Sequence, residues 1–450
     1  MMNSQLKSLL DTFYSTELNQ EKLINNGEMS EEWAVLRYET FQYYLESNNF
    51  FRVRDPAKNH GNYLSILLRF LLGLYDHLIL KYFYKSDYLF FGHTRRKPNS
   101  SEKLIDIYFD DINREFSGQF TYISDPINQI YNEKSKFKSS YIYYYSRFLS
   151  KIPFVQNKYI NSEFLKELTL LLTELEILDI LPSLKRRLTT HFICEFYFHK
   201  LLKKLKPKAI FLVVGQGKEY LVKAARKLNI PSVELQHGTP SKGKLNYDCT
   251  NAKKIEIADY FLTFGDYWSE QIKVLKYTTQ IEAIGYPYLS EKVNNFQKQG
   301  SRDHILILSQ ATINKELSSY AHFLAEKNFK ILYKLHPQES QNWQKLFPEL
   351  EHDNIEVVPG STNLDDCFKR SHSQVGVYST AIYEGLAFQC QTFIIKVPGW
   401  EHMTNFIEKG FGTLIEPHQI PDINSQNKID SEYYFSKEWK KRLKSFLENF

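Results

Sequence analysis

Short apolar runs alternate with longer amphipathic segments in the second half of the chain, and this alternation constrains the fold more than any other feature. Between 209 and 284 the apolar spacing changes from that of strands to that of helices and back. A strand, a crossover helix and a second strand form a βαβ unit with parallel strands. The segment therefore predicts a parallel sheet, with strands over 209–214, 232–236, 260–264 and 281–284 and a helix over 218–228.

A second series of the same kind begins at 304, after Gly285-Tyr286-Pro287 and a polar run over 291–303 that together predict a linker between domains. Its predicted strands cover 304–308, 329–335, 355–358, 374–378 and 392–397, and its predicted helices cover 315–327, 364–370 and 381–389. With 450 residues, the chain is long enough for two α/β domains, each with its own core. We therefore expect two doubly wound parallel sheets.

The first 200 residues are mainly helical by apolar spacing. Helices are clearest over 31–47, 63–84 and, with a break at Pro182, over 139–206, while short strands are expected at 88–91 and 120–123. The predicted organisation is a helical extension over 1–84, an N-terminal domain over 85–290, a C-terminal domain over 300–430, and a stretch over 431–450 whose helix (437–449) packs back across both domains.

Charge and cysteine content exclude several classes of function. The 57 basic and 52 acidic residues leave a net charge of +5, which is too small an excess to indicate a nucleic-acid-binding protein but leaves anionic small substrates open. The four cysteines show no metal-type spacing and predict buried free thiols in a reducing compartment: Cys194, Cys249, Cys367 and Cys390. No HExxH, paired CxxC or calcium-loop motif occurs, so no metal site is expected.

Targeting features point to the cytoplasm. The beginning of the chain lacks the basic and apolar regions of a signal peptide. The most apolar stretch, 63–84, is interrupted by Arg69, Asp76, His77 and Lys81, so it is too polar for a membrane-spanning helix. We expect a buried amphipathic helix there; the alternative is a helix lying on the inner face of the cytoplasmic membrane.

Three motifs directly follow predicted strands. They are His237 with Gly238, His336 with Pro337, and Ser379 with Thr380. In open parallel sheets, ligands bind outside the carboxyl ends of the strands. A single histidine after a strand is more often a hydrogen-bonded loop residue, so the prediction of a site depends on all three motifs. Together they predict a cleft to which both domains contribute.

His237 is the candidate general base, because an imidazole titrates near neutral pH and can remove a proton from an acceptor hydroxyl. Gly238 and Thr239 would let a ligand approach the backbone, although an ordinary turn explains them as well. Gly215, Gln216 and Gly217 form a loop between a strand and a helix, and they would line the acceptor side of the cleft. This loop lacks the complete dinucleotide-binding and Walker patterns.

The second and third motifs suit a phosphate. Pro337 keeps His336 extended, so that its imidazole N–H would donate to a phosphate oxygen of the leaving nucleotide, unless it is a satisfied loop histidine. Ser379 and Thr380 are good helix N-caps, and the one not needed for capping would join the free N–H groups in binding phosphate. Glu384 would bind ribose hydroxyls or be a solvated helix carboxylate.

Three basic clusters are read as solvated faces, with a lipid-linked or polyanionic acceptor as the alternative. They are Arg95-Arg96-Lys97, 203–208 and Lys440-Lys441-Arg442.

These motifs resemble those of bacterial GT-B glycosyltransferases that build surface polysaccharides. Gln236-His237-Gly238-Thr239-Pro240 with Lys242 resembles the His-Gly-Thr-Pro segment of CDP-glycerol glycerophosphotransferases. His336-Pro337 and Ser379-Thr380 resemble motifs that those enzymes share with bacterial sialyltransferases and Kdo-type capsule transferases. The resemblance covers about 209–400. One departure is the loop 215–217, which has no acidic residue where the sialyltransferases have their catalytic base, so sialyl transfer is not favoured.

The resemblance implies two Rossmann-like domains facing a cleft, a donor held mainly by the C-terminal domain, and metal-independent transfer without a cofactor. We therefore expect a cytoplasmic, inverting transferase of the cell envelope or capsule. It would move a glycosyl or polyol-phosphate unit from a nucleotide-activated donor to a glycan or lipid-linked glycan acceptor. CMP- or CDP-linked donors are slightly favoured over UDP-linked ones. The alternatives are a sugar-nucleotide 2-epimerase and a non-catalytic GT-B-like scaffold of a capsule complex.

Overall fold

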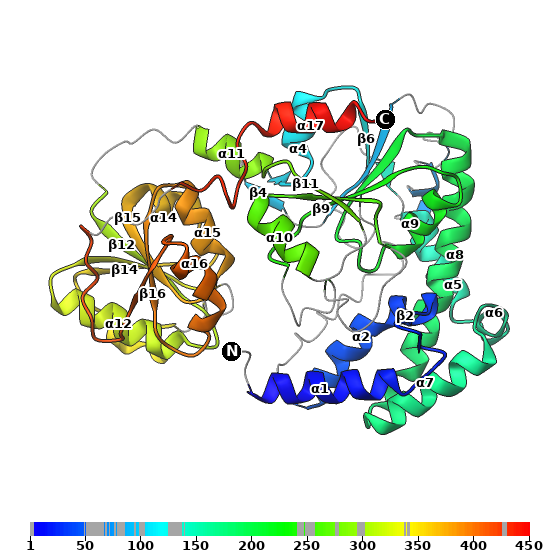
Figure 1. The fold of residues 1–450 in the computed structure, drawn as a ribbon, viewed down its shortest axis with the longest axis horizontal. Coiled ribbons are helices and arrows are strands. Elements are labelled where there is room, and N and C mark those ends of the chain that lie inside the picture. The colour runs from blue at the N-terminus through cyan, green and yellow to red at the C-terminus, as the bar shows by residue number, and fades with distance from the viewer. Residues whose placement is uncertain are drawn as a thin grey trace. The chain divides into compact units, whose positions relative to one another are not determined.

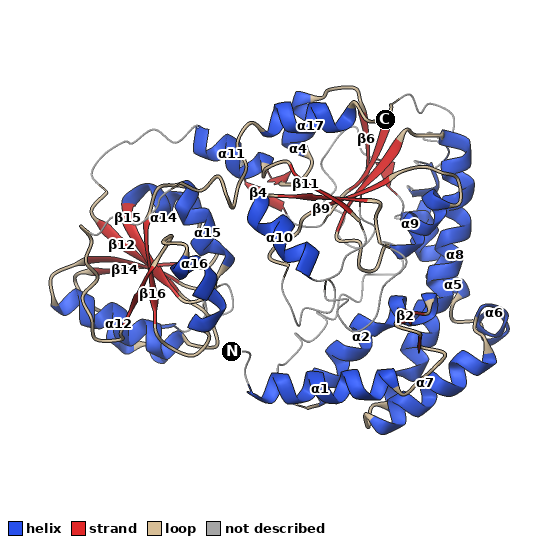
Figure 2. Ribbon diagram, viewed as in Figure 1, coloured by secondary structure: helices blue, strands red, loops and turns tan. Residues whose placement is uncertain are grey.

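A computed structural model describes most of the chain, in two compact units (Figures 1 and 2). The described residues are 4–48, 50, separate positions between 67 and 78, 86–93, 96–98, 104–124, 137–138, 140–240, 247, 257–274, 279–294, 302–336, 339, 343–424 and 430–450. The N-terminal unit comprises Gln5–Ile284 and Lys440–Phe450, and the C-terminal unit comprises Gly285–Trp439. The predicted helix over 63–84 lies largely outside the described residues.

The N-terminal unit contains a parallel sheet of seven strands in the order β11-β10-β9-β8-β3-β6-β7. The strands are β3 (Tyr88–Phe91), β6 (Phe120–Ser124), β7 (Phe137–Lys138), β8 (Ala209–Val213), β9 (Ser232–Leu235), β10 (Tyr260–Thr263) and β11 (Gln280–Ala283). Every residue of β3, β8 and β9 is buried, as expected for central strands of a parallel sheet that is covered on both faces.

Helices of the N-terminal unit pack on this sheet and on one another. They are α1 (Ser4–Leu18), α2 (Glu31–Ser47), α4 (Asp110–Glu115), α5 (Ser140–Leu149), α6 (Pro153–Tyr159), α7 (Ser162–Glu174), η1 (Leu178–Ile180), α8 (Leu181–Leu205), α9 (Glu219–Arg226), α10 (Asp266–Val274) and α17 (Trp439–Leu447). The long helix α8 contributes Phe198 and Leu202 to a core that includes Leu89 of β3 and Leu212 of β8. Pro182 lies in the first turn of α8, where its missing N–H costs no helical hydrogen bond.

Two short antiparallel pairs accompany the main sheet. They are β1 (Ile24–Asn25) with β2 (Glu28–Met29), and β4 (Arg96–Pro98) with β5 (Leu104–Asp106). The first pair connects α1 to α2, and the second follows the end of β3. Sequence spacing predicts neither pair, because strands of two or three residues are too short for an alternation to be visible.

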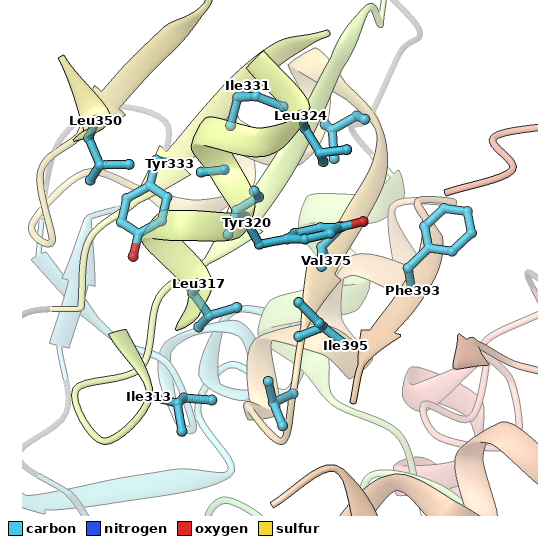
Figure 3. Close-up of a cluster of buried hydrophobic side chains, with 14 of the residues drawn as sticks. Ile313, Leu317, Tyr320, Leu324, Ile331, Tyr333, Leu350, Val375, Phe393 and Ile395 are labelled. Atoms are coloured by element: carbon cyan, nitrogen blue, oxygen red, sulfur yellow. The ribbon is translucent and has the colours of Figure 1, made fainter. Parts of the chain in front are cut away.

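The C-terminal unit has a six-stranded parallel sheet in the order β14-β13-β12-β15-β16-β17. Its elements are α11 (Pro287–Asn294), β12 (His304–Leu308), α12 (Asn314–Glu326), β13 (Lys330–Lys334), α13 (Trp343–Leu346), η2 (Pro348–Leu350), β14 (Ile355–Val358), α14 (Leu364–Arg370), β15 (Ser371–Gly376), α15 (Thr380–Ala387), β16 (Gln391–Ile395), η3 (Trp400–Met403), α16 (Thr404–Glu408) and β17 (Thr413–Ile415). Helix α12 packs on the sheet through a fully buried core (Figure 3), whose members include Leu317, Tyr320, Leu324, Ile331, Tyr333, Val375, Phe393 and Ile395.

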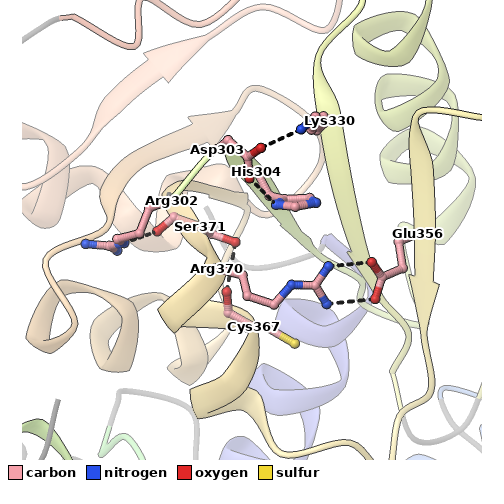
Figure 4. A network of polar contacts seen from close by, with 8 residues as sticks. All are labelled: Arg302, Asp303, His304, Lys330, Glu356, Cys367, Arg370 and Ser371. Carbon is pink, nitrogen blue, oxygen red and sulfur yellow. Dashed lines mark hydrogen bonds and ion pairs between the residues drawn. The ribbon is translucent and has the colours of Figure 1, made fainter. Parts of the chain in front are cut away.

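A polar network joins the amino-terminal ends of these strands (Figure 4). Arg370 at the end of α14 makes a bidentate ion pair with Glu356 of β14, and Lys330 pairs with Asp303. The pKa of Glu356 is lowered by this hydrogen bond from Arg370. The other members drawn are Arg302, His304, Cys367 and Ser371. The network lies at the edge opposite to the one where ligands of parallel sheets bind, so we assign it to stability.

The linker predicted over 291–303 is wrong at its start, because α11 extends to Asn294 with Pro287 at its first position. Cys194, Cys367 and Cys390 are buried free thiols, whereas Cys249 lies outside the described residues. Among the described residues, no helix combines the length and the apolar character that crossing a bilayer requires.

Candidate functional site

The carboxyl ends of β3, β8, β9 and β10 lie along one edge of the N-terminal sheet, because all four strands are parallel. His93 follows β3 by two residues, and His237 follows β9 by two residues. Their imidazole ring centroids are 4.7 Å apart, and the ring of Tyr108 is 5.9 Å from that of His237. We call His93, Tyr108 and His237 the histidine cluster. It brings two bases and a phenol together where a ligand is expected.

The backbone around His237 is held from the next strand. The buried amide of Gln236 accepts a hydrogen bond from the N–H of Phe264 (2.8 Å) and donates one to the carbonyl of Gly238 (2.7 Å). The Tyr247 hydroxyl donates to the carbonyl of His237 at 2.9 Å. Gly238 has a φ of +72°, in the left-handed region that glycine adopts without strain. The position of His237 is therefore determined by buried partners on both sides.

The loop Gly215–Gly217 after β8 lies beside a carboxylate that the sequence motifs do not reveal. Gly215 donates its N–H to Glu234 at 2.9 Å, and Glu234 is 3% exposed. A Cβ on Gly215 would lie 2.5 Å from a Glu234 oxygen, so any larger residue here would displace the Glu234 carboxylate. The side-chain nitrogen of Gln216 is buried without a hydrogen-bond partner in the described part of the chain. This amide therefore has hydrogen-bonding capacity that no described group uses.

Lys218 links this loop to β3. Its ammonium donates to the carbonyl of Gly92 (3.2 Å) and to that of Val213 (3.0 Å). These are the carbonyls at the ends of β3 and β8. Lys218 therefore places a positive charge between the two strand ends. One of its two partners, Gly92, directly precedes His93.

A buried polar triad supports the other side of the histidine cluster. Asp106 is fully buried, pairs with Arg96 at 3.0 Å and accepts the Tyr122 hydroxyl proton at 2.7 Å. It also accepts the N–H of Tyr108 at 3.0 Å and that of His93 at 3.4 Å. Burial raises the pKa of Tyr122, which therefore remains a neutral donor. Interpreting Arg96 as part of a solvated face is wrong, because its side chain is only 17% exposed.

In the C-terminal unit, His336 follows β13 and is held by Glu339. The N–H of His336 donates to the Glu339 carboxylate, and the N–H of Glu339 donates back to the His336 carbonyl, both at 2.8 Å. Pro337 lies outside the described residues. Lys334 at the end of β13 is 8% exposed and donates to the carbonyls of Pro359 and Gly360, and burial lowers its pKa.

Ser379 is the N-cap of α15, and its hydroxyl accepts the N–H of Ala381 at 3.2 Å. Capping therefore accounts for Ser379, whereas Thr380 is exposed at the first helical position and Glu384 is partly exposed one turn later. Both β13 and β15 flank β12, so His336 and Ser379 lie at one edge, separated by about 10 Å at ordinary strand spacing. That this edge and the histidine cluster share one cleft stays a prediction.

One further group of side chains has the geometry of a metal site. Glu31, His191 and Glu195 offer ligand atoms within 4.8 Å of one another. The ammonium of Lys223 pairs with both carboxylates, and Lys227 pairs with Glu195. These cations already neutralise the acidic groups, so we interpret the group as an ion-pair network.

The sequence motifs identified His237 but missed His93, Tyr108, Lys218 and Glu234. His93 could have been found, because it lies two residues after the strand predicted over 88–91, much as His237 directly follows the strand predicted over 232–236. Tyr108 and Glu234 carry no comparable signal, since their proximity arises from the short pair β4–β5 and from burial within β9.

Comparisons with known proteins identify the fold. No protein-family model matches the chain, and no curated protein matches it in sequence. Among solved structures, the UDP-GlcNAc 2-epimerase of Methanocaldococcus jannaschii has a TM-score of 0.50 at 12% identity, covering 80% of this chain and 99% of that one. The epimerase of Rickettsia bellii (TM-score 0.48, 13% identity, 81% and 96% covered) and MurG of Acinetobacter baumannii (0.43, 12%, 81% and 100%) are also similar. The chain therefore has the GT-B fold, with two Rossmann-like α/β domains and a helical N-terminal region.

Proposed function

We propose that this protein is a metal-independent transferase that moves a glycosyl or polyol-phosphate unit from a nucleotide-activated donor to a hydroxyl of a surface glycan. The observation that carries the proposal is the histidine cluster, which lies at the carboxyl edge of a parallel sheet with two imidazoles 4.7 Å apart. Ligands of such sheets bind at this edge. The GT-B fold supports the use of a nucleotide-activated donor as an analogy of architecture.

In the proposed reaction, His237 takes the proton of the acceptor hydroxyl as that oxygen forms a bond to the donor carbon or phosphorus. The bond from that atom to the nucleotide's phosphate oxygen breaks, and the nucleotide leaves with the electron pair. His93 and Tyr108 would orient the His237 imidazole. His336, Thr380 and the N-terminus of α15 would bind the leaving phosphate, and Glu384 the ribose.

Two classes of nucleotide are candidates for the donor. The motif resemblance favours CMP or CDP, whereas the fold similarity to an enzyme named for UDP-GlcNAc raises UDP. A thermal-shift series with CMP, CDP, UDP and GDP separates them. A nucleotide at about 100 times its Kd stabilises the protein by about 2.7 kcal/mol, which is readily measured.

The catalytic test is turnover of the donor identified in this way, with and without acceptor glycans. We expect His237→Ala to lower kcat by about 10²- to 10⁴-fold, the usual contribution of a general base, while donor affinity is kept. His199→Ala is the matched control, since His199 lies on α8, which carries no residue of the histidine cluster. Wild-type turnover by His237→Ala with the true donor would disprove the assignment of the base.

A 2-epimerase is the second candidate, because the similar structure from Methanocaldococcus jannaschii has that activity in its name. It predicts conversion of a free UDP-sugar in the absence of any acceptor. A non-catalytic scaffold, the third candidate, predicts no turnover of any donor and an unchanged amount of surface polysaccharide in cells that carry His237→Ala. Action on the growing glycan at the inner face of the membrane remains part of the transferase proposal.

A further inference from the structure

A cavity of about 630 Å³ lies within the N-terminal unit, between the helices α2, α5 and α8 and the loop that follows β8. Its volume is in the range of small-molecule sites. Residues of the predicted helical extension form one wall, including Tyr38 and Gln42, and the loop Gln216–Lys218 forms another. The cavity is therefore built from the N-terminal helices together with the loop after β8, which is also part of the candidate site.

The lining of this cavity is strongly basic. Arg147, Lys151, Arg186, Arg187 and Lys218 contribute to it, whereas the acidic residues of its described lining are Glu39 and Glu219, the latter with a buried carboxylate oxygen. Glu39 pairs with Arg187 at 3.1 Å, so that pair is already neutral.

Two of the cations have no partner of their own. Among the described residues, the side chains of Lys151 and Arg186 make neither an ion pair nor a hydrogen bond, and both are exposed. In the part of the chain that the structure describes, the Arg147 guanidinium donates to the neutral hydroxyl of Tyr143, at 3.2 Å, and to no other group. Three positive charges that are not neutralised around one cavity favour an anionic occupant.

The cavity also contains an unsatisfied donor. The side-chain nitrogen of Gln216 is buried and lacks a hydrogen-bond partner in the described chain. A buried polar group without a partner is costly unless a ligand or water satisfies it. Gln216 is two residues from Lys218, whose ammonium contacts the carbonyl of Gly92 beside His93. Lys218 therefore borders both the cavity and the strand end that precedes His93.

We propose that this cavity binds a phosphate- or carboxylate-bearing sugar or polyol, namely the anionic end of the acceptor. Guanidinium groups bind the planar or tetrahedral oxyanion with charge-assisted hydrogen bonds, and the Gln216 amide donates to one of its oxygens or hydroxyls. The cavity's preference for anions stands on its own lining, whereas its role as the acceptor site rests on the proposed transferase function.

The test is binding of glycerol 3-phosphate, glucose 6-phosphate and glucuronate to the full-length protein, measured by calorimetry, with glycerol and glucose as neutral controls. The wild type should bind at least one anionic probe and neither neutral one. The double variant Lys151→Gln/Arg186→Gln should weaken binding at least tenfold, since both charges are lost. Lys203→Gln/Lys204→Gln removes the same charge from exposed positions at the end of α8 and should bind like the wild type.

A second variant guards against a purely non-specific charge effect. Gln216→Met keeps the length and the neutrality of the side chain but removes the unsatisfied donor, so it should also weaken the anionic probes about tenfold. Equal binding by the pocket variants and the wild type, equal binding of neutral and anionic probes, or no binding of any probe would each overturn the proposal.

The same variants separate this proposal from that of the transferase. Nucleotide binding in the thermal-shift series should be unchanged in Lys151→Gln/Arg186→Gln, because neither residue belongs to the proposed donor site. If no nucleotide binds but the anionic probes do, the transferase function fails and the anion site stands. If nucleotides bind and turn over but the anionic probes do not bind, the anion site fails and the transferase stands.

Discussion

At the scale of single residues, the geometry of the candidate site is maintained by buried polar groups that lie behind the residues facing a ligand. Asp106 connects the histidine cluster to the sheet, because it accepts the backbone N–H groups of His93 and Tyr108. The charge of Asp106 is stabilised by Arg96 and by the hydroxyl of Tyr122. Removing one partner of a buried charge costs more than removing an exposed ion pair.

We therefore expect Tyr122→Phe to destabilise the protein by about 1.5–3 kcal/mol, the usual worth of a hydrogen bond to a charged group. The Tyr122 hydroxyl both donates to Asp106 at 2.7 Å and accepts from Arg96 at 2.8 Å, so the variant leaves two charged groups short of a partner. Urea unfolding of the wild type and the variant measures the difference.

Tyr260→Phe is the matched control for this change. The ring of Tyr260 packs on Phe446 and Phe450, and in the described chain its hydroxyl makes no hydrogen bond. It should therefore stay within about 0.5 kcal/mol of the wild type. A Tyr122→Phe protein as stable as this control would show that Asp106 does not depend on the hydroxyl.

Residues of the site could be predicted where a local sequence pattern indicates them. They could not be predicted where their role depends on a partner that is distant in sequence. His237 and His336 both follow strands, and the alternation of strands and helices indicated these positions. Arg96 appeared to be one of three consecutive cations, and nothing nearby indicates that Asp106, ten residues later, pairs with it across β4–β5. Glu234 looked like an ordinary strand residue, because a buried carboxylate has no signature of its own in sequence.

At the scale of elements, the packing of α15 on the C-terminal sheet depends on a close approach at Gly385. A Cβ at this glycine would lie 2.1 Å from the side-chain oxygen of Gln374, a fully buried residue of β15. The same amide donates to the carbonyl of Ile382 at 2.7 Å and to the hydroxyl of Thr392 at 2.9 Å. Helix α15 carries Ser379 and Thr380 at its start, so this contact also determines where the proposed phosphate site lies.

We expect Gly385→Ala to cost about 2 kcal/mol. Overpacking of a dense core costs about 1–3 kcal/mol and displaces the Gln374 hydrogen bonds, whereas alanine's better helix propensity returns only about 1 kcal/mol. The measurement is a double-mutant cycle by urea unfolding, with Gln374→Ala as the second change. In the Gln374→Ala background the same glycine substitution should be neutral or stabilising, because the clashing side chain is gone. Additive effects of the two changes would contradict the close contact.

Most elements of the two sheets could be predicted, since central parallel strands are apolar throughout and the helices between them are amphipathic. The predicted helix 381–389 corresponds to α15 (Thr380–Ala387), and the predicted strand 374–378 to β15 (Ser371–Gly376). The short edge strands β7 and β17 were not predicted, because two or three residues cannot display a period. The close contact at Gly385 could not be predicted either, because a glycine inside a helical pattern indicates such a contact only once its neighbour is known.

At the scale of the whole molecule, the N-terminal unit is made from two segments that are separated in sequence by the C-terminal unit. The C-terminal unit ends at Trp439, and Lys440–Phe450 belongs to the N-terminal unit. There the hydroxyl of Tyr88 in β3 donates to the carbonyl of Leu447 at 3.2 Å, and the Phe446 ring packs 5.3 Å from that of Tyr260 in β10. The last helix therefore closes the core of a unit whose other residues precede it by more than a hundred positions.

This arrangement predicts that a core substitution in α17, near the C-terminus, lowers the stability of the N-terminal unit. Phe446 is 1% exposed, and Phe446→Ala should cost about 3–5 kcal/mol, as other buried phenylalanine truncations do. Hydrogen exchange followed by mass spectrometry should show faster exchange in β3, β8 and β10, while β12, β13 and β15 keep their protection. Phe393→Ala is the reciprocal control, since Phe393 is fully buried in the core of the C-terminal unit and should accelerate exchange in β12, β13 and β15. If Phe446→Ala instead accelerated exchange equally in both sheets, the two units would unfold together. The prediction that α17 stabilises the N-terminal unit alone would then be wrong.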